Sequence, residues 1–167
     1  LWSLALRLMA APLTLLGSAV GDVYFRRATE VRRSQGDSLL LYRRVLVRLA
    51  VLSAPPFIFL ALFAPWLFGI VFGPAWEQSG VYARIMVPWL WVRFLTSPLS
   101  RTTFVFGRNR LDLVIQATLA VVALGTALVA WQAKWDFDVF LTVVSVLLAL
   151  TYGALLLVFV RVIKTGE

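Results

Sequence analysis

Arg93 lies in the middle of a long, mainly apolar stretch, residues 80–106. It stands thirteen positions from each end of this stretch, which is about 20 Å along a helix that rises about 1.5 Å per residue. An arginine at the centre of a bilayer costs about 2.5 to 3.5 kcal/mol on insertion scales, so its guanidinium should face a bundle interior, a counter-charge or a water-filled path. A shielded guanidinium of this kind is suited to holding an anion.

Aromatic and polar side chains flank Arg93 at helical spacing. Trp89, Ser97 and Arg101 stand at intervals of four residues on either side of it, with Ser100 beside them. In a helix these side chains share one face and form a stripe that runs toward one end. We therefore predict a cationic substrate-binding stripe that suits an anionic cargo.

Arg7 is a further candidate for the same cationic cavity, because it interrupts the first apolar segment, residues 1–25. Arg7 and Arg93 each have an alternative, structural interpretation. An arginine can extend its guanidinium to the lipid headgroups, or it can bind backbone carbonyls that a nearby proline leaves without a hydrogen bond. Arg101 can equally belong to the positive charge at a membrane surface.

Several kinds of chemistry are absent from the sequence. The chain has no cysteine and no histidine, which removes thiol nucleophiles, the commonest zinc ligands and the usual proton shuttle at neutral pH. None of its carboxylates lies deep in an uncharged stretch, and Asp22 is close enough in sequence for a local ion pair with Arg26. No phosphate-binding glycine loop or nucleophile motif is present. The sequence thus predicts no enzyme, no cofactor and no metal site.

The elements that must position these side chains are membrane-spanning helices. Hydrophobic residues make up 61% of the 167 residues and charged residues only 14%, too few to cover a soluble domain. Each apolar segment is long enough to cross about 30 Å of hydrocarbon as a helix. We predict an all-α polytopic bundle that forms a single unit over residues 1–167, with spans at 1–25, 49–72, 80–106, 113–133 and 139–160.

Basic residues are distributed unevenly between these spans. The first connection, residues 26–48, holds seven arginines, and further basic residues lie in the third connection and after residue 160, whereas Lys134 is alone in the other two connections. The positive-inside rule therefore places the first and third connections and the C-terminus in the cytoplasm. The net charge of +8 favours anionic lipid headgroups over nucleic acid as partners.

The first connection has two interpretations. Residues 39–48, which begin with Leu39, Leu40, Leu41 and Tyr42 and contain three arginines, fit an amphipathic surface helix whose guanidinium groups lie among lipid phosphates. A solvated linker fits the same residues. The sequence leaves both open.

Prolines occur in the first three predicted spans and are absent from the last two. A proline removes a backbone donor and tends to kink a helix, which a bilayer tolerates where neighbouring helices or a wet cavity satisfy the freed carbonyls. The first three spans are therefore expected to line a cavity, with the last two as a supporting wall. The prolines within these spans are Pro12, Pro55, Pro56, Pro65, Pro88 and Pro98.

Two segments carry a resemblance to a known family. They are LALRLMAAPLTLLGSAVGDVYFRRATE near the start and LFGIVFGPAWEQSGVYARIMVPWLWVRFLTSPLSRTTFVFGRNRL in the middle. The chain resembles bacterial polysaccharide biosynthesis membrane proteins, the Wzx-like flippases of the MOP superfamily. The resemblance implies the second bundle of a transporter of twelve or more helices, which exports an isoprenoid diphosphate-linked oligosaccharide across the bacterial inner membrane. It also implies a partner bundle, the N-terminal one, that is missing here.

The start of the chain suggests a fragment, and several functions remain open. Leu1 is not an initiator methionine and no leader precedes it, so a fragment is expected, with an independent short chain as the alternative. A membrane glycosyltransferase or ligase of the same pathway, a multidrug exporter of the same superfamily, and a non-transporting scaffold remain open as functions.

Overall fold

Five long helices account for most of the chain. The computed structural model describes the backbone of residues 2–166 and the side chains of residues 17–108 and 110–166. These residues form helices and no strands, which confirms the predicted all-α fold. The long helices are α1 (Trp2–Arg33), α2 (Ser38–Phe72), α3 (Glu77–Leu99), α5 (Asn109–Gln132) and α6 (Phe137–Gly166), and the short ones are η1 (Pro74–Trp76) and α4 (Thr102–Val105).

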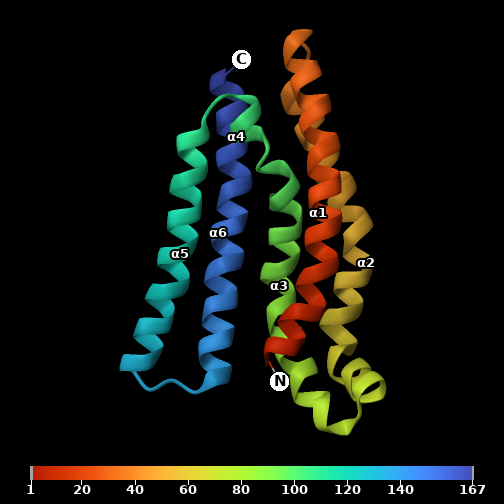
Figure 1. Ribbon diagram of the computed structural model, residues 1–167, viewed down its shortest axis with the longest axis vertical. Coiled ribbons are helices and arrows are strands. Elements are labelled where there is room, and N and C mark those ends of the chain that lie inside the picture. The colour runs from red at the N-terminus through yellow and green to blue at the C-terminus, as the bar shows by residue number, and fades with distance from the viewer. Residues whose placement is uncertain (1, 167) are drawn as a thin grey trace.

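The long helices run up and down in alternation (Figure 1). The α1–α2 connection, the segment between α3 and α5, and the C-terminus lie together at one end of the bundle, and the α2–α3 and α5–α6 connections lie at the other. We call the first of these the basic end, because most arginines of the connections gather there. Helix α3 is central and packs on α1, α2 and α6, whereas α5 packs mainly on α6.

The helices at the basic end extend further than predicted. Residues 26–48, predicted as a loop, are helical except at 34–37, because α1 continues to Arg33 and α2 already begins at Ser38. Asp37 caps α2, since its carboxylate accepts a hydrogen bond from the Leu40 amide at 2.7 Å. The helical interpretation of residues 39–48 therefore replaces the linker, and this helix is continuous with the second span.

The third span ends earlier than predicted. Helix α3 stops at Leu99 instead of continuing to residue 106. The Ser100 hydroxyl donates to the Ser97 carbonyl at 2.8 Å, and the Thr103 hydroxyl donates to the Ser100 carbonyl at 2.8 Å. These side chains compete with helical hydrogen bonding, and Gly107, with φ of 67°, then turns the chain toward α5.

Gly80 sets the distance between α2 and α3. A Cβ atom at this position would lie 2.4 Å from Pro65 Cα and 2.5 Å from the Ala64 carbonyl oxygen. The two backbones therefore approach as closely as they do only because no side chain separates them. Further along the same interface, the Trp91 indole donates to Ser53 Oγ at 2.9 Å.

Two glycines bring α1 against the end of α3. A Cβ at Gly17 would lie 3.5 Å from Ser97 Oγ, and one at Gly21 would lie 3.4 Å from Pro98 Cα. Glycines four residues apart form a flat face that lets membrane helices approach closely. This contact fixes α1 beside the polar stripe at Ser97 and Arg101.

The outer surface of the bundle is strongly apolar. Leu52 is 80% exposed, Leu113 71% and Trp131 78%, and such side chains are stable in contact with lipid rather than water. Three of the described helices are long and apolar enough to cross a membrane: α2, α5 from Arg110 onward, and α6.

Candidate functional site

A small polar cavity lies between α3, α5 and α6. Its volume is about 160 Å³. Helix α3 contributes four polar residues to its wall, and apolar side chains of α5 and α6, among them Phe159, close it. The polar lining consists of Arg93, Thr96, Ser97 and Ser100 from α3, Asp112 and Gln116 from α5, and Tyr152 from α6.

Arg93 lies near the middle of the apolar depth of the bundle. Thr96, almost one turn further along α3, has its hydroxyl 3.3 Å from the Tyr152 carbonyl oxygen on α6. The uncharged stretch of α6 runs from Val139 to Val160, and helix rise places the level of Arg93 about 15 Å from either end of that stretch. Although α3 itself ends only six residues beyond Arg93, its guanidinium therefore lies far from both ends of α6.

Arg93 forms no ion pair with a carboxylate among the described residues. The ion pair found there joins Arg101 to Asp22. Its guanidinium lies 5.6 Å from the centre of the Trp89 ring, a cation–π contact that holds the side chain in place. Asp112 lines the same cavity without forming an ion pair with Arg93. The Arg93 guanidinium therefore keeps donors for a further hydrogen-bonding group, and an anion bound to it would be repelled by the Asp112 carboxylate unless it lay on the side of Arg93 away from Asp112.

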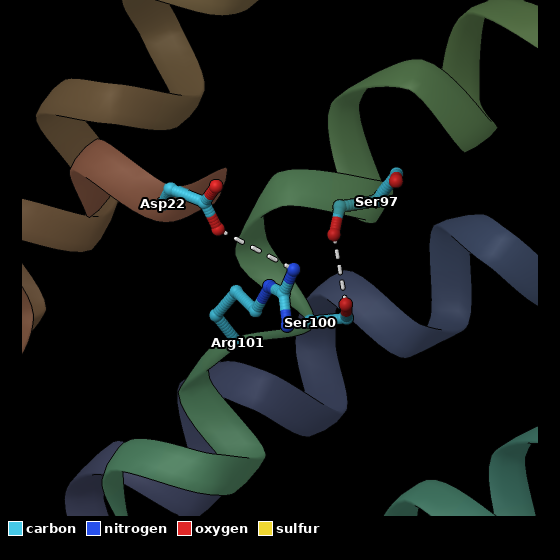
Figure 2. Close-up of polar contacts among 4 residues, drawn as sticks. All are labelled: Asp22, Ser97, Ser100 and Arg101. Atoms are coloured by element: carbon cyan, nitrogen blue, oxygen red, sulfur yellow. Dashed lines mark hydrogen bonds and ion pairs between the residues drawn. The ribbon is translucent and has the colours of Figure 1, made fainter. Parts of the chain in front are cut away.

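Arg101 belongs to a separate contact, shown in Figure 2. Its guanidinium pairs with the Asp22 carboxylate of α1 at 3.5 Å, with side chains 43% and 66% exposed. Asp22 thus pairs with Arg101 and not with Arg26, because Gly21 lets α1 approach α3 and brings Asp22 within reach of Arg101. Arg101 thus joins two helices and does not line the cavity.

The structure separates the five predicted site residues. Arg93 and Ser97 line the same cavity, and Trp89 supports Arg93 from outside it. Arg101 lies beyond it, at the α1 contact. The backbone of Arg7 lies in α1, but its side chain lies outside the described residues.

Sequence analysis missed four polar residues of the cavity. Thr96 lies on the predicted span but off the predicted stripe, and Asp112 was assigned to a loop edge. Gln116 and Tyr152 stand out only as polar residues within apolar stretches, a signal that was present. The last two spans, expected to be a supporting wall, contribute these residues, so α5 and α6 line the cavity together with α3.

Comparison with known families gives one match, over residues 1–81, to the family described as polysaccharide biosynthesis protein. This part of the chain belongs to the polysaccharide biosynthesis protein family. The match bears out the predicted family for these residues, and three helices of the described part have the length and apolar composition of membrane spans. No curated protein and no solved structure matches the chain.

The match covers α1, α2 and the first residues of α3. The cavity at Arg93 lies beyond the matched residues. The resemblance of the middle segment therefore remains a prediction, and the geometry of the cavity is the observation that bears on its role.

The Asp22–Arg101 ion pair is expected to contribute little to stability. Both side chains are more than one third exposed, and exposed pairs are typically worth about 0.2 to 1 kcal/mol because solvent screens them. A double-mutant cycle with Asp22→Asn and Arg101→Gln, read by thermal unfolding in detergent, should give a coupling energy within that range. A coupling of several kcal/mol would contradict this assignment.

Proposed function

We propose that the chain forms part of a flippase that moves lipid-linked oligosaccharides across the bacterial inner membrane for cell-surface polysaccharide synthesis. The observation that carries the proposal is Arg93, a half-buried arginine near the middle of the apolar depth, which opens on a polar cavity and has no ion-pair partner among the described residues. The family match over residues 1–81 supports a role in polysaccharide biosynthesis.

The chemistry of the cargo explains why an arginine is needed at this depth. A diphosphate linkage loses its hydration when it enters an apolar bundle, and charge-assisted hydrogen bonds from a guanidinium replace part of that hydration. Arg93 would bind a phosphate oxygen, and Ser97 and Tyr152 would donate further hydrogen bonds from the cavity wall. Trp89 holds the guanidinium in position.

The size of the cavity limits what it can hold. A volume of about 160 Å³ corresponds to roughly five water molecules, and pockets for whole ligands are usually about 300 Å³ or larger. The cavity therefore fits a phosphate-sized group and not a sugar chain. We propose that the sugars pass through a wider opening. A partner bundle completes this opening, and the cavity lies in one wall of it.

Orientation follows from the distribution of charge. The basic end carries Arg26, Arg33, Arg108 and Arg161 on several helices, so we assign it to the cytoplasmic face, with a cytoplasmic C-terminus. The arginines at this face would attract the anionic cargo, which then reaches Arg93 by alternating access between bundles. We assign no catalytic step to the chain.

Loss of the full-length protein should test transport directly. In a strain that lacks it, lipid-linked oligosaccharide is expected to accumulate in the cytoplasmic leaflet while surface polysaccharide disappears. In proteoliposomes, the purified full-length protein should move a fluorescent isoprenoid diphosphate sugar to the opposite leaflet, measured by its accessibility to a membrane-impermeant quencher. Sugar transfer without translocation would favour a glycosyltransferase or ligase, and translocation of cationic drugs alone would favour a multidrug exporter.

A further inference from the structure

A second basic site lies between α1 and α2, away from the Arg93 cavity. It is a groove of about 290 Å³ lined by three arginines, one from α1 and two from α2, together with apolar side chains. The residues recur at intervals of three and four, so each helix contributes a single face. They include Val20, Val23 and Arg27 on α1, and Leu41, Arg44 and Arg48 on α2.

The positive charge in this groove is uncompensated within the described residues. No carboxylate lines it, and neither an ion pair nor a hydrogen bond satisfies Arg27, Arg44 or Arg48 there. Three guanidinium groups on two facing helices repel one another, and a phosphate between them would relieve the repulsion while accepting charge-assisted hydrogen bonds.

The depth of the groove matches the headgroup layer. Arg48 directly precedes the uncharged stretch 49–72, which begins the membrane-spanning part of α2. Tyr24 and Arg27 lie where the predicted first span ends. A phosphate bound by the arginines would therefore lie at the level where lipid phosphates lie.

The apolar part of the groove points to a lipid rather than a free anion. Val20, Val23 and Leu41 lie beside the arginines, and exposed apolar side chains follow Arg48 along α2, with Val51 68% and Leu52 80% exposed. An acyl chain that descends from the phosphate would cover this surface, which inorganic phosphate cannot do.

We propose that this groove binds one anionic phospholipid of the leaflet at the basic end, with the lipid phosphate held by Arg27, Arg44 and Arg48. The bound lipid bridges α1 and α2 at the point where the two helices leave the membrane. This site is distinct from the cavity assigned to the cargo and does not depend on the transport proposal.

Native mass spectrometry of the purified chain in detergent tests this site, with phosphatidylglycerol and phosphatidylcholine as probes. We expect one phosphatidylglycerol to bind more tightly than phosphatidylcholine. The double substitution Arg44→Gln with Arg48→Gln should weaken phosphatidylglycerol binding roughly thirtyfold, since each basic group near the surface is worth about one decade or slightly less. All three arginine side chains are exposed, so these substitutions leave the helix packing intact.

A matched control removes the same charge from the same end. Arg43 and Arg161 are exposed and line no described cavity, so the double substitution Arg43→Gln with Arg161→Gln should leave phosphatidylglycerol binding within about twofold of the original. The charge-preserving pair Arg44→Lys with Arg48→Lys should retain most of the binding.

Three results would overturn the proposal. Equal losses in the two glutamine variants would show general surface attraction. Equal binding of both lipids by the original chain would show that charge does not select the occupant. Displacement of phosphatidylglycerol by millimolar inorganic phosphate would show a free-anion site, whereas persistence of the lipid supports the groove as a phospholipid site.

Discussion

Replacing Arg93 by alanine in the full-length protein is expected to abolish surface polysaccharide while leaving the protein in the membrane. The substitution removes the cationic group near mid-depth of the bundle, and a hydrogen bond to a charged group is worth about 1.5 to 3 kcal/mol. Translocation of the lipid-linked oligosaccharide should therefore fall roughly ten- to a hundredfold. Quantitation of surface polysaccharide, together with the proteoliposome assay, measures the loss.

Arg84 supplies the matched control for this experiment. It lies on α3 nine residues before Arg93, a spacing that places it on the opposite face of the helix. Its side chain is exposed. Arg84→Ala should leave translocation nearly unchanged, and Arg93→Lys should give an intermediate rate because lysine keeps the charge but loses the planar fork. Normal polysaccharide in Arg93→Ala at normal expression would refute the assigned role and favour a scaffold.

Replacing Gly80 by alanine is expected to cause a large loss of stability. The new Cβ would lie 2.4 Å from Pro65 Cα and 2.5 Å from the Ala64 carbonyl oxygen. Both contacts are with backbone, which cannot move aside like a flexible side chain, so α2 and α3 must separate. Overpacking of this kind costs typically about 1 to 3 kcal/mol, and we expect the upper end of that range.

Gly125 in α5 provides the control for Gly80. A Cβ at Gly125 would meet nothing within 4 Å, so Gly125→Ala should leave the unfolding temperature unchanged or raise it slightly, because alanine is less flexible in the unfolded chain. Thermal unfolding in detergent, followed by gel filtration or circular dichroism, compares the two variants. Equal unfolding temperatures would show that the close α2–α3 approach is not required.

The apolar segments predict that the chain is helical, but they do not predict where each helix begins and ends. Polar backbone groups must be satisfied within each segment in hydrocarbon, so long apolar segments that cross it become helices. Residues 26–48 were harder to predict, because a charged amphipathic sequence has the same composition as a linker. Their helices are completed by the Asp37 cap and by the hydrogen bond from the Tyr42 hydroxyl to the Leu156 carbonyl at 2.9 Å.

The candidate site was likewise only partly predictable from the sequence. Arg93 could be found from sequence because a charge in an apolar stretch is energetically expensive wherever the stretch packs. Its neighbours on other helices could not, since Asp112 and Tyr152 are distant in sequence and meet α3 only after α5 and α6 pack. The partner of Arg101 was likewise decided by the approach of α1 at Gly21.

The sequence by itself determined that the chain is a helical membrane bundle with a basic end and a deeply placed arginine, because hydrophobicity and the cost of an isolated charge act locally along the chain. Tertiary structure alone decided which polar groups share the cavity with Arg93 and which arginines form the groove between α1 and α2. Those arrangements depend on how closely helices approach one another, which glycines such as Gly80 permit but which no single segment specifies.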